Sequence, residues 1–277
     1  MQIAFTLTGL GEIWLLRADG SQRVLARNAA HPAWSPDGRA IAFERAAPQG
    51  DPFSAIWTDD IWVVHADGTG LRRLTSSPMT ENEPAWSPDG RKIIFTRDPG
   101  YELPEIWVMN ADGSAKRRLT RDANRDDDPA WSPDGSKIAF ASSALDSFID
   151  SNIYVMQADG SGRRLLASGH GEHFGLYEPG WSPDGTRIVF AQDDEIWIMN
   201  ADGSDRRRLT EVADYSWADK EPDWSPDGRW IVFEREGSDS DYKWSGVLLV
   251  RPDGTDLRRL IGPEADDPKW RPPPRSR

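Results

Sequence analysis

The sequence predicts an all-β protein, a six-bladed β-propeller built from four-stranded blades. Three observations lead to this prediction: a motif recurs at regular intervals, short strand-like runs lie between tight turns, and the first and last runs complete one another. Trp-Ser-Pro-Asp-Gly occurs five times, and the segment 270–272 is a sixth, altered copy. Six copies in 277 residues give a repeat of about 46 residues, a length typical of propeller blades.

Each repeat contains four short runs that are typical of β-strands, and we name them strands A to D. In the second repeat they are residues 83–86, 92–95, 106–109 and 117–120. They are rich in β-branched and aromatic side chains and are bounded by Gly, Pro and Asp. Ser-Pro-Asp-Gly forms the A–B turn and Asp-Gly the C–D turn, because proline presets φ and glycine accepts a positive φ.

The lengths of the connections differ between the two faces of the predicted ring. The strand A tryptophan lies nine residues before the strand B phenylalanine in all five full copies, as from Trp34 to Phe43. The step from strand B to strand C instead varies from 6 residues (Phe190 to Ile196) to 18 (Phe43 to Ile61). The B–C and D–A loops share one face, so the variation falls on the face where binding residues usually lie.

The two ends of the chain complete one blade. Residues 2–7 match strand B, and residues 267–270 match strand A. We therefore expect the last blade to combine the C-terminal strand A with the N-terminal strands B, C and D, which closes the ring and removes the open sheet edge. The propeller then spans residues 1–271 as a single domain, and residues 272–277 form a disordered basic tail.

The repeated motifs resemble those of a known family. Pro-x-Trp-Ser-Pro-Asp-Gly, Ile-x-Phe, Ile-Trp-Val-Met and Asp-Gly followed by Arg-Arg-Leu-Thr resemble the WD-type repeats of TolB-like six-bladed β-propellers. The resemblance covers residues 2–270. It implies this fold, a periplasmic or extracytoplasmic location and the binding of a protein partner. The first residues of the chain as given carry neither the basic region nor the long apolar stretch of a signal peptide.

Composition excludes several classes of protein. Asp and Glu number 46 against 33 Lys and Arg, so the formal net charge is −13, which disfavours binding to nucleic acid or to an anionic membrane. The absence of cysteine excludes disulfides and thiolate metal sites. No apolar run approaches the roughly 20 residues of a membrane-spanning helix. We expect a monomer that does not insert into a membrane.

One register position carries a titratable side chain in every blade. It lies three residues before the strand A tryptophan, so ring closure gathers the six copies at the mouth of the central channel, on the variable face. They are His31, Glu83, Asp128, Glu178, Glu221 and Asp267. Two interpretations stay open. Each carboxylate caps backbone N–H groups of its own blade, or the six residues form an acidic mouth that binds a basic peptide segment or a cation. Oxygen ligands favour calcium over zinc, with Glu83, Asp128, Glu178, Glu221 and Asp267 as its candidate ligands on the central axis.

Aromatic residues outside the register form a second candidate surface. Tryptophans that repeat in register pack neighbouring blades against each other. Aromatic residues in the variable loops are instead candidates for an exposed partner-binding surface. They include Trp57, Tyr101, Tyr177, Trp217 and Trp244.

Three other patterns in the sequence are candidates for a site or for a structural role. Residues 122–128 place oxygen ligands at alternate positions like a calcium loop but lack its glycine, which favours a solvated acidic loop. Residues 170–173 form the one histidine cluster. Paired arginines in strand D are expected to discourage edge-to-edge pairing.

The sequence contains no phosphate loop, dinucleotide fingerprint or Gly-x-Ser-x-Gly elbow. It therefore favours a non-catalytic binding propeller that engages a protein or peptide partner through its variable face and channel mouth. The alternative is a propeller-type lyase or hydrolase with a carboxylate or metal site in the channel mouth.

Overall fold

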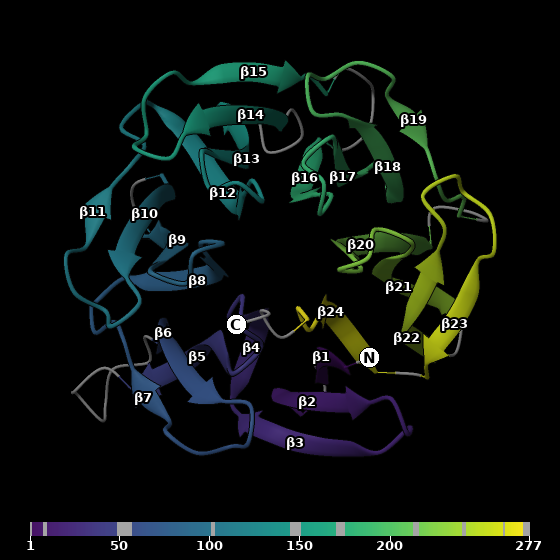
Figure 1. Cartoon of the computed structure of the whole chain (residues 1–277), viewed down its shortest axis with the longest axis horizontal. Coiled ribbons are helices and arrows are strands. Elements are labelled where there is room, and N and C mark those ends of the chain that lie inside the picture. The colour runs from purple at the N-terminus through teal and green to yellow at the C-terminus, as the bar shows by residue number, and fades with distance from the viewer. Residues whose placement is uncertain are drawn as a thin grey trace.

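A computed structural model shows six blades arranged in a ring around a central channel (Figure 1). It describes residues 2–7, 10–48, 57–100, 103–144, 151–169, 175–212, 216–239, 242–262 and 264–273. Each blade is a four-stranded antiparallel sheet, and the described residues contain no α-helix. This confirms the predicted fold class. A search of the same residues for a helix long and apolar enough to cross a membrane finds none.

The strands follow one another from the axis outward in every blade. The innermost strand A of blades 1 to 6 is, in order, β4 (Ala29–Trp34), β8 (Thr80–Trp86), β12 (Asn124–Trp131), β16 (Leu176–Trp181), β20 (Trp217–Trp224) and β24 (Ala265–Trp270). Strand B is β5 (Ala40–Pro48), β9 (Lys92–Asp98), β13 (Lys137–Ala144), β17 (Arg187–Gln192), β21 (Ile231–Asp239) and β1 (Gln2–Leu7). Strand C is β6 (Trp57–His65), β10 (Glu105–Asn110), β14 (Asn152–Gln157), β18 (Glu195–Asn200), β22 (Tyr242–Val250) and β2 (Glu12–Arg17). The outer strand D is β7 (Arg72–Arg73), β11 (Arg117–Arg118), β15 (Arg164–Ala167), β19 (Arg207–Arg208), β23 (Arg258–Ile261) and β3 (Gln22–Arg27).

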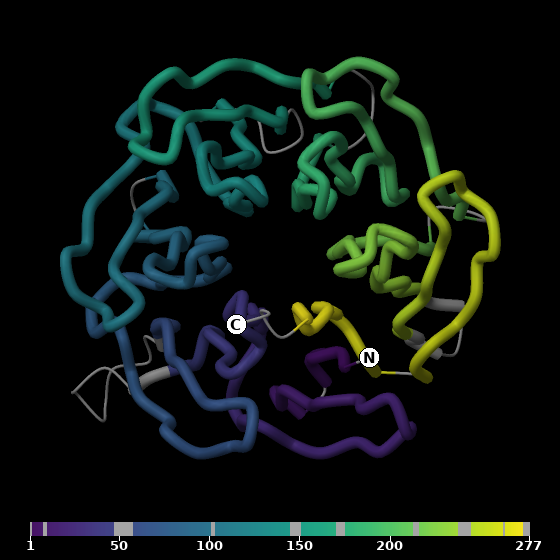
Figure 2. The backbone as a smooth tube through the Cα atoms, in the orientation of Figure 1, coloured from purple at the N-terminus to yellow at the C-terminus, as the bar shows by residue number. Residues whose placement is uncertain are grey.

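The ring closes as the sequence predicts. β24 pairs antiparallel with β1, from Ile3 opposite Trp270 to Leu7 opposite Ala265. The two ends of the chain therefore lie side by side in blade 6 (Figure 2). Beyond β24, the Arg271 N–H donates to the Gln2 carbonyl at 2.9 Å. Blade 6 is thus the one blade whose A–B connection is made by hydrogen bonds in place of a Ser-Pro-Asp-Gly turn.

The hydrophobic core lies between the blades. Each blade buries both faces of its sheet against its neighbours, so the Ile-x-Phe run of strand B is buried on both sides. Isoleucine and phenylalanine side chains from blades 1 and 2, for example, meet in one cluster with Leu74 and Met109. The strand B phenylalanine is at most 1% exposed in every blade: Phe5, Phe43, Phe95, Phe140, Phe190 and Phe233.

Every innermost strand contains the same β-bulge. In blade 2, Asn82 pairs with Thr96 and Ala85 with Ile94, so two residues, Glu83 and Pro84, lie opposite one phenylalanine. Proline is tolerated there because the extra residue of a bulge leaves the ladder. The first residue of each bulge is a channel-mouth residue, and the six have φ between 45° and 55°. Such left-handed backbone strains a non-glycine residue by about 1–3 kcal/mol.

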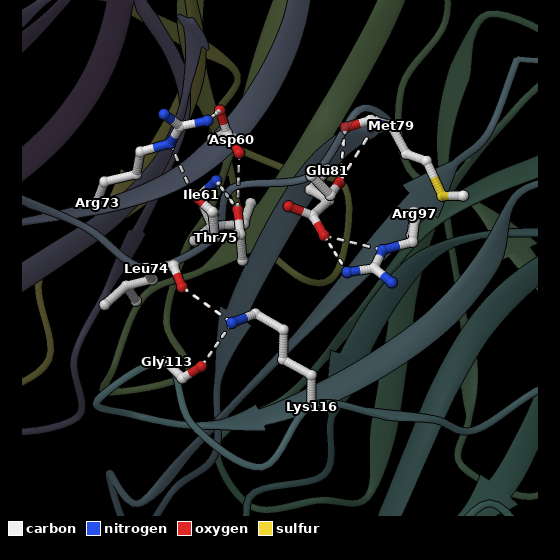
Figure 3. Close-up of polar contacts among 11 residues, drawn as sticks. Asp60, Ile61, Arg73, Leu74, Thr75, Met79, Glu81, Arg97, Gly113 and Lys116 are labelled. Atoms are coloured by element: carbon white, nitrogen blue, oxygen red, sulfur yellow. Dashed lines mark hydrogen bonds and ion pairs between the residues drawn. The ribbon is translucent and has the colours of Figure 1, made fainter. Parts of the chain in front are cut away.

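The paired arginines of strand D join structural elements and do more than protect an outer edge. The Arg72 guanidinium donates to the carbonyls of Ala111 and Asp112 in the next blade, at 3.0 and 3.2 Å. Arg73 turns back and pairs with Asp60 of its own blade at 2.5 Å (Figure 3). The same within-blade pair recurs as Arg118 with Glu105 and Arg208 with Glu195. In blade 6, Glu12 pairs instead with Arg27 at the end of strand D.

Deletion of residues 1–7 tests the closure. The deletion removes β1, which leaves β24 without its partner and exposes an edge of β2. Exposed edges promote intermolecular strand pairing. We therefore expect a lower melting temperature and aggregation, measured by differential scanning calorimetry and light scattering. A truncated chain that melts like the full chain and stays monomeric would contradict this account.

Candidate functional site

The six bulge residues surround one cavity on the axis. This cavity has a volume of about 520 Å³ and is lined by all six channel-mouth residues together with the prolines and tryptophans of strand A. Strand A begins at the mouth and ends at its tryptophan, so the tryptophans lie toward the opposite face. Pro272 and Pro273, the first residues of the predicted tail, also line the cavity.

Three of the carboxylates form a hydrogen-bonded relay from blade to blade. Glu83 Oε2 accepts the backbone N–H of Asp128 at 2.8 Å. Asp128 Oδ2 accepts the N–H of Glu178 at 3.0 Å, and Glu178 Oε2 accepts the N–H of Glu221 at 2.6 Å. Each acceptor caps the same position of the next blade, whereas one sequence interpretation had it cap its own blade. The bulge makes this possible because its extra residue leaves the ladder within the blade.

The ring is completed by two cationic side chains. Lys269 Nζ lies 2.9 Å from Glu221 Oε2 and 3.1 Å from Asp267 Oδ1. His31 Nδ1 lies 2.8 Å from Glu44 Oε1, and the His31 side chain is 37% exposed. The mouth therefore has one side where carboxylates meet cations and another where they meet backbone N–H groups.

The pKa values differ around the mouth, and burial raises the pKa of Asp267 to about 7 despite the neighbouring Lys269. Burial, together with the charge of Glu221, raises the pKa of Glu178 to about 8. Burial and the neighbouring Glu83 and Glu178 raise the pKa of Asp128 well above its usual value. Burial also tends to raise the pKa of Glu221, but Lys269 and His31 outweigh it and lower that pKa.

The other predicted sites have different outcomes. Tyr177 and Trp217 are half-buried; Tyr177 packs against a core cluster, and Trp217 lies opposite Gly237. The side chains of Trp57, Tyr101 and Trp244, and the segment 170–174, lie outside the part of the chain whose side chains the structure describes.

The segment 122–128 is neither a solvated loop nor a calcium loop. Residues 124–128 belong to β12, and Asp126 is fully buried. Arg163 pairs with both Asp126 and Asp122. Across the described ranges, no three His, Asp or Glu side chains converge as they would around a metal ion.

Sequence reasoning missed the bulge and the blade that supplies each N–H donor. The signal for the bulge is the proline that follows every channel-mouth residue inside an innermost strand, because proline is otherwise excluded from a central ladder. The ion pair between the start of strand C and the second arginine of strand D was also detectable. An acidic residue directly precedes the first isoleucine of strand C in four blades, and in three of them the second arginine of strand D pairs with it.

A family model described as "TolB beta propeller domain" matches residues 12–170 and 100–273. The Tol-Pal system protein TolB of Anaeromyxobacter dehalogenans is 39% identical over 82 residues, which are 28% of this chain and 17% of that relative. A protein of Bacillus subtilis named "Uncharacterized peptidase YuxL" is 37% identical over 65 residues, or 24% of this chain and 9% of that relative. The crystal structure of TolB from Acinetobacter baumannii matches with a TM-score of 0.75 and 20% identity, covering 98% of this chain and 66% of that one.

The raised pKa of Glu178 predicts how stability depends on pH. The pKa rises from 4.5 to about 8 on folding, so the stabilisation is complete below pH 4.5 and is lost as the pH rises toward 8. Glu178→Gln stays neutral throughout and can still accept the Glu221 N–H. Between pH 5 and pH 9 we expect the melting temperature of the variant to fall less than that of the wild type, by roughly 3–8 °C.

Asp202→Asn is the matched control for this prediction. Asp202 lies at a C–D turn, where hydrogen bonds from Ser204 lower its pKa. It therefore titrates below the tested range, and its substitution should leave the slope unchanged. Parallel calorimetric curves for Glu178→Gln and the wild type would refute the assignment of the raised pKa to Glu178.

Proposed function

The chain belongs to the TolB β-propeller domain family, and from this premise we propose that it is a non-catalytic binding propeller whose channel mouth receives a basic peptide segment of a protein partner. The observation that carries the proposal is the arrangement of Glu83, Asp128 and Glu178. They line a cavity of about 520 Å³, and their contacts within the described residues are to backbone N–H groups and one hydroxyl.

Electrostatics supports a cationic ligand. Like charges that gather in a partly desolvated mouth repel one another more strongly than in water. Burial first, and then this repulsion, raise the pKa values of Asp128 and Glu178, and protonation relieves the repulsion. A lysine or arginine side chain would relieve it equally well. Its entry would favour the ionised carboxylates, so binding near pH 7 would release protons.

The dimensions of the mouth support a peptide segment. A cavity of about 520 Å³ is within the range of small-ligand pockets and holds only a few side chains. In blades 1 to 4 the walls below the carboxylates are proline, alanine or glycine, and tryptophan, which suit the apolar part of a long basic side chain. Tyr177 and Trp217 lie near the start of the innermost strands β16 and β20, and in the same proposal they add contact area beside the mouth.

The enzymatic alternative has less support. The peptidase relative matches over only 9% of its length. A lyase or hydrolase needs a positioned acid, base or metal, and within the described segments no three His, Asp or Glu side chains converge as they would around a metal ion. No specific arrangement of residues here favours that chemistry.

Selection from a random peptide library on the immobilised protein tests the proposal. We expect the enriched peptides to share a lysine or arginine and to bind more weakly as salt is raised. Calorimetric titration at pH 7 in buffers of different ionisation enthalpy should show proton release. The triple variant Glu83→Gln, Asp128→Asn, Glu178→Gln should weaken binding by about tenfold or more.

The control for this experiment removes the same number of charges from the opposite face. Asp112→Asn, Asp159→Asn and Asp202→Asn alter three C–D turns and should leave affinity unchanged. Enrichment of acidic or uncharged peptides, or equal loss of binding in both triple variants, would contradict a basic ligand at the channel mouth.

A further inference from the structure

One channel position departs from the repeat in two neighbouring blades. The residue just before the strand A tryptophan is small in blades 1 to 4, where it is Ala33, Ala85, Ala130 or Gly180. In blades 5 and 6 it is Asp223 and Lys269. Both of these side chains line the channel cavity. Two neighbouring blades therefore place one acidic and one basic side chain at a level of the channel where the other four blades carry alanine or glycine.

Lys269 is placed between two carboxylates that belong to different blades. Its ammonium lies 2.9 Å from Glu221 Oε2 in blade 5 and 3.1 Å from Asp267 Oδ1 in its own blade. The Asp267 side chain is only 7% exposed, and among the described residues neither of its oxygens accepts a hydrogen bond of good geometry. The ammonium is thus the group that neutralises a buried carboxylate.

The strand that carries Lys269 is fixed from both sides. The Lys269 carbonyl accepts the indole N–H of Trp34 from blade 1 at 3.2 Å. The backbone N–H of the next residue, Trp270, donates to Asp223 Oδ2 at 2.8 Å in blade 5. The backbone from which the ammonium extends is consequently fixed by both neighbouring blades, while the ammonium itself contacts Glu221 and Asp267.

The opposite side of the mouth has a different composition. Of the ion pairs formed by residues that the structure describes, none includes Glu83, Asp128 or Glu178. Their carboxylate oxygens accept backbone N–H groups and the Thr96 hydroxyl. The mouth therefore has one side where cationic side chains lie among the carboxylates and an opposite side, among the described residues, where the carboxylates form no ion pair.

We propose that Lys269 is a built-in counter-ion that occupies the cation position between Glu221 and Asp267, so that external cations are excluded from this side of the channel. Lys269 is then a specificity-determining residue. A cationic group of a partner would enter on the side of Glu83, Asp128 and Glu178. Only this last consequence rests on the proposed function, because the counter-ion role concerns the unliganded protein.

Removal of the ammonium with chemical rescue tests the counter-ion. Lys269→Ala leaves the buried Asp267 carboxylate without its cation and removes the nearer of the two cationic partners of Glu221. Loss of one partner of a buried ion pair is strongly destabilising, and we expect the melting temperature to fall by roughly 5–10 °C. The deleted atoms are three carbons and the nitrogen, so millimolar n-propylammonium has the matching length. It should restore at least half of the loss, while n-propanol should not.

The matched control is Lys220→Ala. Lys220 is adjacent in sequence to Glu221, but its ammonium pairs with Glu236 and its side chain is 41% exposed. It should lose little stability and show no rescue. Calcium chloride should raise the melting temperature of Lys269→Ala by several degrees more than that of the wild type or of Lys220→Ala, because only the first has a vacated cation position.

Two results would overturn the proposal: a Lys269→Ala variant as stable as the wild type, or a loss that propylammonium and calcium leave unchanged. If Lys269→Ala does not fold, Lys269→Met keeps the volume and lacks the charge. Its melting temperature should fall more between pH 5 and pH 9 than that of the wild type, because its carboxylates then ionise without a cation. A melting temperature that changes with pH as in the wild type would overturn the proposal. All of these measurements use the protein without a partner, so their failure is separable from failure of the peptide selection.

Discussion

The β-bulge in the innermost strand is the constraint on which the rest of the channel depends. It places two residues opposite one buried phenylalanine, and it holds the first of them in left-handed backbone. Glycine would adopt this backbone without strain, yet no blade uses it there. The position requires a side chain, because in blades 2 to 4 this side chain accepts the backbone N–H group of the bulge in the next blade. The strain, the relay and the ring of charge therefore have a single origin.

The repeat register accounts for what could be predicted from the sequence. A constant spacing from tryptophan to phenylalanine fixes strands A and B, and matching ends fix the closure, because both follow from counting residues. Register also brings Glu83 and its equivalents to one level of the channel. It cannot tell which blade supplies each hydrogen-bond donor, because that depends on the direction in which a bulged N–H points. A register built from the repeated residues also ignores positions where one blade differs from the others, and Lys269 is such a position.

The channel illustrates how a repeated fold acquires a directional surface. Five blades contribute a carboxylate to the mouth, and identical surroundings would give a uniformly acidic ring. His31 replaces one of these acids and Lys269 adds a cation beside it, both within the arc formed by blades 5, 6 and 1. Two departures from the repeat, rather than a new loop or domain, are sufficient to give the mouth one side with cationic side chains among its carboxylates, opposite Glu83, Asp128 and Glu178, for which no ion pair is found among the described residues. Recognition in such a protein depends on the residues that break its symmetry.

Because blade 6 is closed by pairing between β24 and β1, the position of the chain ends can change without a change in the arrangement of the blades. The Arg271 N–H and the Gln2 carbonyl are already within hydrogen-bond distance, at 2.9 Å. A short link between the ends, combined with a cut at any other A–B turn, gives a circularly permuted chain with the same six sheets and the same six bulges. The seam would then move around the ring while the channel kept its arrangement of charges. The contacts that hold the propeller together therefore do not depend on which blade contains the chain ends.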